Sequence, residues 1–244
     1  MARLHQFVLA AVFLTRLPLA RFLPTEELAI RDSIWAFPLV GALIGLLAGL
    51  PLWIDGPELL LAAMSLALSV LLTGSLHEDG LADFADSAGG RDRDARLAIM
   101  RDSRIGSYGV MALILTSGLR LGALAAIGNP LVLVAAAVCG RAAIVLTMAA
   151  LLPARSDGLG WGAGRPGWRL VILATLLALL GLLIAGDGLA AAATAALLML
   201  AVVIRQARVW LGGQTGDVLG AASVLVETAV LCAFALVLAG QANG

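Results

Sequence analysis

The chain has 244 residues, of which 61% are hydrophobic and 13% are charged, whereas a soluble domain carries about 25% charged residues. Its mean hydropathy is +1.01. This composition excludes an ordinary soluble domain and predicts an all-α, polytopic integral membrane protein. The formal net charge is zero, so the charge of the whole chain does not indicate a class of partner. We expect no nucleic acid among the binding partners. The two cysteines lie inside apolar runs and imply no disulfide framework.

Residues 5–20 form a short apolar stretch that is interrupted by the sequence TRLP. Arg16 and Arg21 follow its apolar part, and no small-x-small cleavage site is present, so we expect a retained segment rather than a signal peptide. Pro18 and Arg16 disfavour a simple span. We therefore expect an interfacial or re-entrant helix, with an eighth span as the alternative.

Seven longer apolar runs follow, each close to the roughly 20 residues that cross about 30 Å of hydrocarbon. The predicted spans are residues 33–54, 58–76, 108–127, 130–152, 169–185, 189–204 and 218–239.

All 16 basic residues are arginine, and in the loops they alternate from one side to the other. The arginine-bearing segments are residues 16–33, 77–107, 153–169 and 205–216. The intervening loops and the C-terminal tail have no basic residue. Because positive loops stay in the cytoplasm, we predict one membrane-embedded domain over residues 1–244, with a cytoplasmic acidic and arginine-rich loop at residues 77–107.

That loop begins with the sequence SLHEDGLADFADSAGG, which concentrates acidic residues in a chain otherwise poor in charge. Asp79, Asp83 and Asp86 are spaced i, i+4 and i+7, which places them on one face of a helix. Three carboxylates on one face repel each other unless a cation binds, and Mg²⁺ prefers such oxygen ligands. The alternative is a solvated loop in which acidic and basic residues pair. His77 is either an interfacial residue or a base.

Gly89 and Gly90 end this helix, and the sequence RDRDARLAIMRD predicts a second short amphipathic helix. Its later arginines supply positive charge opposite the acidic face; they are Arg96, Arg101 and Arg104. Residues 91–94 are expected to form a solvated helix start with local ion pairs.

Three charges lie inside predicted spans, where charge is costly unless it is paired or faces an aqueous cavity. Arg141 and Glu227 form an interhelical pair or face substrate, and the third charge is Arg120. Asp217 begins the last span among several glycines, which suits close approach of a ligand or a helix N-cap.

Five segments, taken together, carry a family resemblance. They are FLTRLP at 13–18, LTGSLHEDGLADFADSAGG at 72–90, IMRDSRIGSYG at 99–109, GRAAIVLTMAALLPARSDGLG at 140–160 and GGQTGDVLGA at 212–221. In this order they resemble the cobalamin synthase family, the adenosylcobinamide-GDP ribazoletransferases. The HEDGLAD and RDS-x-x-G-x-x-G segments are the more specific ones. The sequence DFADSAGG departs from the DTADGLGG expected there, without affecting the carboxylates.

The resemblance implies a Mg²⁺-dependent transferase of the bacterial cytoplasmic (inner) membrane. Its substrates would be adenosylcobinamide-GDP and α-ribazole or its 5′-phosphate, and its products adenosylcobalamin or its 5′-phosphate, with GMP. A homo-oligomer or a complex with other cobalamin-assembly enzymes is compatible with this role.

The resemblance also implies roles for individual residues. Mg²⁺ would be held by Asp79, Asp83 and Asp86, with Glu78 as a further ligand or a base. The catalytic residues would be Glu78, Asp79 and His77. The substrate-binding residues would be Arg101, Asp102, Arg104, Arg141 and Asp217.

Two other classes of function compete with this interpretation. Another intramembrane Mg²⁺-dependent phosphotransferase is one, but the CDP-alcohol type needs Ala-Arg where Asp83 and Phe84 stand, and aspartate-rich prenyltransferases need a second motif. A transporter for a cation or a corrinoid is the other, but it favours acidic groups at mid-bilayer and inverted repeats. Glu227 alone has such a depth.

Overall fold

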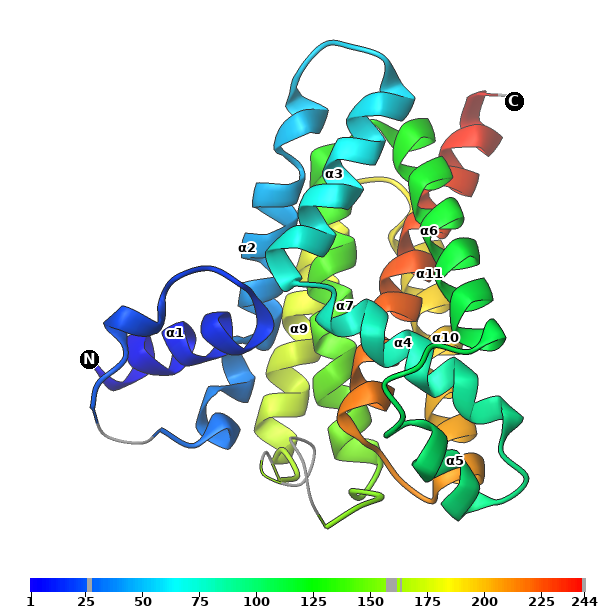
Figure 1. The fold of residues 1–244 in the computed structure, drawn as a ribbon. Coiled ribbons are helices and arrows are strands. Elements are labelled where there is room, and N and C mark those ends of the chain that lie inside the picture. Colours follow the sequence, from blue (N-terminus) through cyan, green and yellow to red (C-terminus); the bar gives the residue numbers. More distant parts are fainter. Residues whose placement is uncertain (26–27, 157–161, 163, 243–244) are drawn as a thin grey trace.

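The structure is a computed structural model that describes the chain except residues 26–27, 157–161, 163 and 243–244 (Figure 1). Apart from one isolated parallel β-bridge between Pro153 and Gln214, the regular structure of the described residues is helical. The α-helices are α1 (Ala2–Leu14), α2 (Phe37–Ala48), α3 (Glu58–Thr73), α4 (Leu76–Asp86), α5 (Arg93–Ile99), α6 (Ser107–Ile127), α7 (Pro130–Ala150), α9 (Trp168–Ala185), α10 (Leu189–Leu211) and α11 (Gly216–Ala242).

In the described chain, six helical stretches are long and apolar enough to cross a membrane, and they correspond to six of the seven predicted spans. The first of them, Ile30–Ala48, includes a 3₁₀ segment that leads into α2. The remaining predicted span is α3, which has 16 residues and is joined to α4 by a bend of 88°. An all-α, polytopic membrane protein is therefore confirmed, with up to seven spans.

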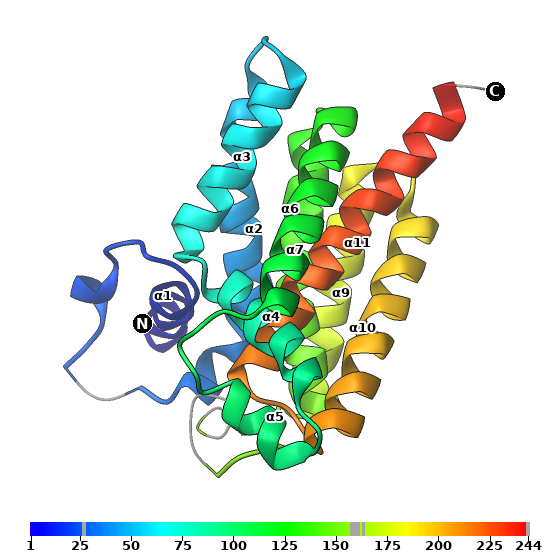
Figure 2. The same ribbon diagram turned by 45° about the vertical axis from the view of Figure 1, so that its right-hand side comes forward.

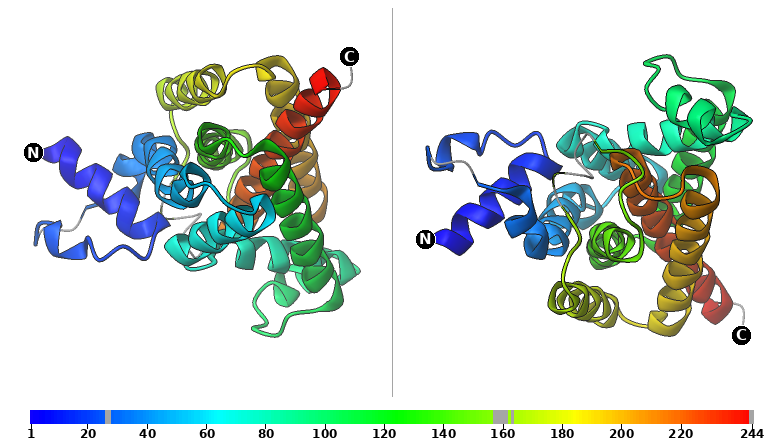
Figure 3. Two further views of the ribbon diagram at one scale, coloured as in Figure 1. Left: turned by 90° about the horizontal axis from the view of Figure 1, so that it is seen from above. Right: turned by 90° about the horizontal axis from the view of Figure 1, so that it is seen from below.

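Helix α7 is the centre of the bundle. In its apolar window 83% of the residues are buried, against 17% for α9 and for α10, so the latter two present most of their surface outward. Helices α2, α9 and α11 pack around α7, and the views along the bundle show α7 enclosed by its neighbours (Figure 3). The outward apolar faces of α9 and α10 suit contact with lipid.

The bend between α3 and α4 depends on two consecutive residues in the left-handed region. Gly74 has φ 62° and ends α3, and Ser75 has φ 60°, a conformation that is uncommon for a residue other than glycine. The Arg16 side chain occupies the space where a Cβ atom on Gly74 would lie, and the backbone N–H of Arg16 donates to the carbonyl of Leu72 at 2.7 Å. The N-terminal segment thus packs on the bend, and α4 runs across the bundle (Figure 1).

The described parts of the arginine-bearing loops after α3, α7 and α10 lie at one end of the bundle, with α5 (Figures 1 and 2). The C-terminal end of α11 lies at the other end, as the alternation of arginine predicts. Helix α1 has 13 residues, too few to span, and lies crosswise beside the bundle against residues Ile30–Ala36 and α2 (Figure 3).

Candidate active site

The acidic helix α4 crosses the first turns of α11 at a glycine on each helix, Gly80 on α4 and Gly220 on α11. A Cβ atom on Gly80 would lie 2.9 Å from the carbonyl oxygen of Asp217, and one on Gly220 would lie 3.2 Å from that of His77. Glycine at both positions permits this close approach. Because Asp79 and Asp217 adjoin these contacts, the crossing brings carboxylates from two distant segments together.

Asp79, Asp83 and Asp217 form what we call the acidic cluster. Burial and, to a lesser extent, the negative charges of Asp217, Asp79 and Asp86 together raise the pKa of Asp83 to about 6. Arg155 Nη2 lies 3.9 Å from Asp217 Oδ2 and offsets part of this charge. Because the negative charges of these carboxylates act on one another, a bound cation would relieve their repulsion.

The donor set of the acidic cluster fits Mg²⁺ only in part. Among the described residues, no three His, Cys, Asp or Glu side chains converge as a ready-made metal site. Mg²⁺ usually keeps several waters and is bound by one or two carboxylates together with substrate phosphates. Asp79 is exposed and Asp83 and Asp217 are half-buried, so water and substrate can reach these carboxylates.

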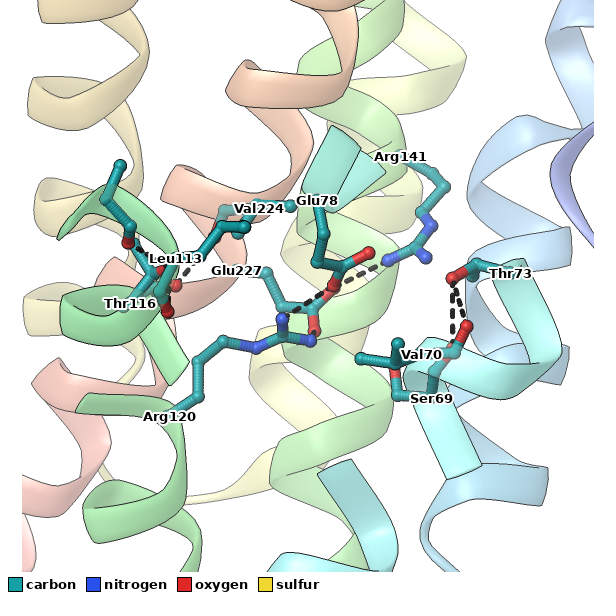
Figure 4. A network of polar contacts seen from close by, with 12 residues as sticks. Ser69, Val70, Thr73, Glu78, Leu113, Thr116, Arg120, Arg141, Val224 and Glu227 are labelled. Carbon is teal, nitrogen blue, oxygen red and sulfur yellow. Dashed lines mark hydrogen bonds and ion pairs between the residues drawn. The ribbon is translucent and has the colours of Figure 1, made fainter. Parts of the chain in front are cut away.

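Glu78 belongs to a buried network of charges rather than to the acidic cluster (Figure 4). Arg120 Nη1 donates to Glu78 Oε1 at 2.9 Å, and Arg120 also pairs with Glu227. Glu227 in turn pairs with Arg141, which confirms the predicted interhelical pair. The network joins α4, α6, α7 and α11. Since Glu78 forms an ion pair with Arg120, we do not include it among the proposed metal ligands.

Asp86 also has partners other than a cation. Its two carboxylate oxygens accept hydrogen bonds from the backbone N–H groups of Gly106 and Gly109, at 2.7 and 2.8 Å. These groups belong to the start of α6, whose first N–H groups have no partner within the helix. Asp86 is buried and fixes α6 on α4, which is a positioning role, and its metal ligation stays a prediction.

The loop between α5 and α6 carries the three predicted substrate-binding residues of the RDS segment. The exposed Arg104 donates to both carboxylate oxygens of Asp102, and these hydrogen bonds lower the pKa of Asp102 to about 2. Both residues line an open groove with Asp86 and Tyr108. Arg101 is exposed on the same loop.

The first arginines of this region hold loops in place. Arg93 donates to the carbonyls of Leu211 and Ala154, at 2.8 and 2.6 Å, in addition to its ion pair with Asp94. The prediction of local ion pairs was therefore incomplete. Arg96 donates to the carbonyl of Gly90 and lies over the ring of Trp210. The positive charge that it was expected to supply opposite the acidic face stays a prediction.

His77 is buried, with 3% of its surface exposed. Neither ring nitrogen has a hydrogen-bond partner within the described residues. Its side chain lines a cavity together with Asp79 and Asp217. His77 therefore faces the interior of the protein, and its role as a base stays a prediction.

Arg155 is a site residue that sequence reasoning missed. It lies on the loop after α7, where Nη2 donates to the carbonyl of Leu97 at 3.4 Å and the buried Nε has no hydrogen-bond partner among the described residues. In the sequence, Arg155 is marked by its place in the segment LLPARSDGLG. Its contact with Asp217 joins residues 62 positions apart (217 − 155), so local sequence patterns do not predict it.

Comparison with known proteins gives a consistent result. Residues 6–235 match the family model described as cobalamin-5-phosphate synthase. Relatives named adenosylcobinamide-GDP ribazoletransferase include one from Bradyrhizobium diazoefficiens, 44% identical over 91% of this chain and 90% of its own, and one from Mesorhizobium japonicum, 40% identical over 93% and 92%. No solved structure gives a significant match.

Proposed function

The chain belongs to the cobalamin-5-phosphate synthase family, and we propose on that basis that it is an adenosylcobinamide-GDP ribazoletransferase. It joins adenosylcobinamide-GDP to α-ribazole or to the 5′-phosphate of α-ribazole. The observation that carries this proposal is the acidic cluster at the crossing of α4 and α11, at the arginine-rich end of the bundle.

The reaction is a displacement at phosphorus. A ribazole hydroxyl attacks the phosphoryl group attached to the cobinamide arm, a new P–O bond forms, and the bond from that phosphorus to the bridging oxygen of GMP breaks. GMP leaves, and adenosylcobalamin or its 5′-phosphate remains. Such a displacement needs positioning and charge neutralisation more than covalent help from the protein.

The acidic cluster is assigned to Mg²⁺ in this proposal. Asp79, Asp83 and Asp217 would hold the ion together with water and the diphosphate of the substrate. Bound there, Mg²⁺ would supply positive charge opposite the phosphate that leaves. Asp79 also lines the cavity beside His77, and we assign it the role of orienting the attacking hydroxyl and taking its proton.

We assign basic groups of the loops after α5 and α7 to phosphate oxygens. Arg155 pairs loosely with Asp217, at 3.9 Å, and is half-buried. Arg101 and Arg104 on the exposed α5–α6 loop supply further positive charge, with Asp102 orienting Arg104. Arg141 acts through Glu227 and keeps the charge network in place.

The site is assigned to the cytoplasmic face of the bacterial inner membrane. The support is that the arginine-bearing loops after α3, α7 and α10 share one end of the bundle with the acidic cluster, as the positive-inside rule requires.

A transporter is the competing function, and one experiment separates the two. The purified protein is given adenosylcobinamide-GDP and α-ribazole, with and without Mg²⁺, in detergent and in vesicles, and GMP is measured. We expect GMP only when both substrates and Mg²⁺ are present, and equally in detergent, because catalysis needs no sealed membrane. Folded protein that releases no GMP in detergent would favour transport.

A further inference from the structure

A cavity of about 110 Å³ lies between α1 and the body of the bundle, next to the acidic cluster. Most of its wall is apolar and comes from α1, the segment before α2, α2 itself, α7 and α11. The apolar lining residues include Phe13, Ile30, Phe37, Ile144, Met148 and Leu219.

The cavity has one buried polar group in its wall and two acidic groups beside it. His77 is 97% buried (3% exposed), and both of its ring nitrogens lack a hydrogen-bond partner among the described residues. A buried polar group without a partner costs free energy, so the imidazole is suited to a ligand that donates to it or accepts from it. Asp79 and Asp217 line the same cavity.

Two aromatic rings in the wall suit a flat ligand. Phe13 and Phe37 are stacked, with ring centroids 5.9 Å apart and an interplanar angle of 20°. Their edges and faces favour contact with another aromatic ring. An engineered apolar cavity of roughly 150 Å³ holds benzene, so a cavity of about 110 Å³ accommodates about one aromatic ring.

We propose that this cavity binds the heteroaromatic base of the acceptor nucleoside, with His77 hydrogen-bonded to a ring nitrogen and the sugar directed toward Asp79 and Asp217. The inference rests on the proposed function, because ribazole is a nucleoside with a largely apolar fused base. One ring of the base enters the cavity, and the sugar hydroxyl that attacks phosphorus remains beside the carboxylates. A lipid acyl chain is a poorer occupant, because it would leave the imidazole unsatisfied.

The test compares two substitutions on α7. Ile144→Phe places extra volume in the cavity, whereas Leu146→Phe, two residues along, faces a second cavity between α7, α9 and α10. We expect Ile144→Phe to raise KM for ribazole by about tenfold or more, the scale on which a pocket discriminates small differences in size. KM for adenosylcobinamide-GDP should stay unchanged, and Leu146→Phe should leave both constants unchanged.

His77→Phe gives a second readout, because it keeps the shape of the ring and removes both nitrogens. We expect weaker ribazole binding by calorimetry in the absence of the corrinoid, and a raised KM with kcat largely kept, as when uniform binding is lost. Should Ile144→Phe fail to fold, Ile144→Ala enlarges the same cavity and should shift preference toward ribazole analogues with a bulkier base.

The outcomes separate this inference from the proposed function. Wild-type protein that neither binds ribazole nor releases GMP would contradict the function itself. Active wild-type protein whose folded Ile144 and His77 variants keep the wild-type KM and affinity for ribazole would overturn the inference alone. The cavity would then belong to lipid or detergent.

Discussion

Asp83 occupies a position in which the folded protein disfavours its negative charge. Burial, with the charges of its acidic neighbours, raises its pKa from 3.8 to about 6. The folded state therefore binds more protons than the unfolded state between about pH 4 and 6, and stability falls as pH rises through that window. Asp83 thus lowers the stability of the folded protein at neutral pH, and a destabilising residue in the acidic cluster is consistent with a functional role.

Asp83→Asn should therefore raise the midpoint of thermal unfolding at pH 7.5 in EDTA, and it should flatten the pH dependence between pH 4 and 6. Unfolding curves of the wild-type protein and the variant across this range would measure both effects. A variant less stable than the wild-type protein at pH 7.5 without metal would show that Asp83 is a structural residue.

At the scale of helices, the network around Glu227 joins α4, α6, α7 and α11 through buried ion pairs. Glu227 is 2% exposed and holds Arg120 and Arg141. Removing one partner of a buried pair leaves an uncompensated charge, which costs about 3–5 kcal/mol. Glu227→Gln should lower the unfolding midpoint in detergent strongly, whereas Asp94→Asn, whose side chain is 92% exposed, should leave it unchanged. Equal midpoints would contradict the structural role.

The glycine contact between α4 and α11 is the geometric basis of the acidic cluster. Gly80→Ala adds a methyl group 2.9 Å from the carbonyl oxygen of Asp217, so the two helices must move apart. A displacement of about 1 Å at a reacting group can cost about 100-fold in rate, and we expect kcat/KM for GMP release to fall on that scale. Gly118→Ala on α6, where no atom lies within 4 Å of the new Cβ, is the matched control. Similar activity in both variants would contradict the assigned contact.

At the scale of the whole molecule, the orientation can be tested at the C-terminus. The C-terminal end of α11 lies at the end of the bundle opposite α5 and the described parts of the loops after α3, α7 and α10. If those loops are cytoplasmic, a phosphatase fused to the C-terminus should be active and a fluorescent protein fused there should be dark. The reverse pattern would invert the orientation or remove one of the spans.

The sequence predicted the membrane spans well, because apolar length alone decides them. Residues 108–127 and 130–152 differ from α6 and α7 by at most two residues at either end. The bend after α3 was not predicted, because Ser75 adopts a left-handed conformation that its residue type does not indicate. The crosswise position of α1 depends on tertiary contacts.

Helical spacing predicted the acidic face but not the partners of each carboxylate. Asp79 and Asp83 belong to the acidic cluster, whereas Asp86 accepts hydrogen bonds from the backbone N–H groups of Gly106 and Gly109. Glu78 pairs with Arg120, 42 residues away. Such contacts between distant segments are set by how α4, α6 and α11 pack, and local periodicity carries no information about them.

The claim that the acidic cluster holds Mg²⁺ for phosphoryl transfer is tested most directly by the Mg²⁺ dependence of GMP release. The measurement compares wild-type protein with Asp83→Asn and with Asp94→Asn as the exposed control, all shown to be folded. We predict that Asp83→Asn lowers kcat by about 10²–10³, the scale for one lost electrostatic contact in a transition state. It should also need more Mg²⁺ for half-maximal rate, while Asp94→Asn keeps the wild-type response. A folded Asp83→Asn protein with the wild-type rate and the wild-type Mg²⁺ response would contradict the account.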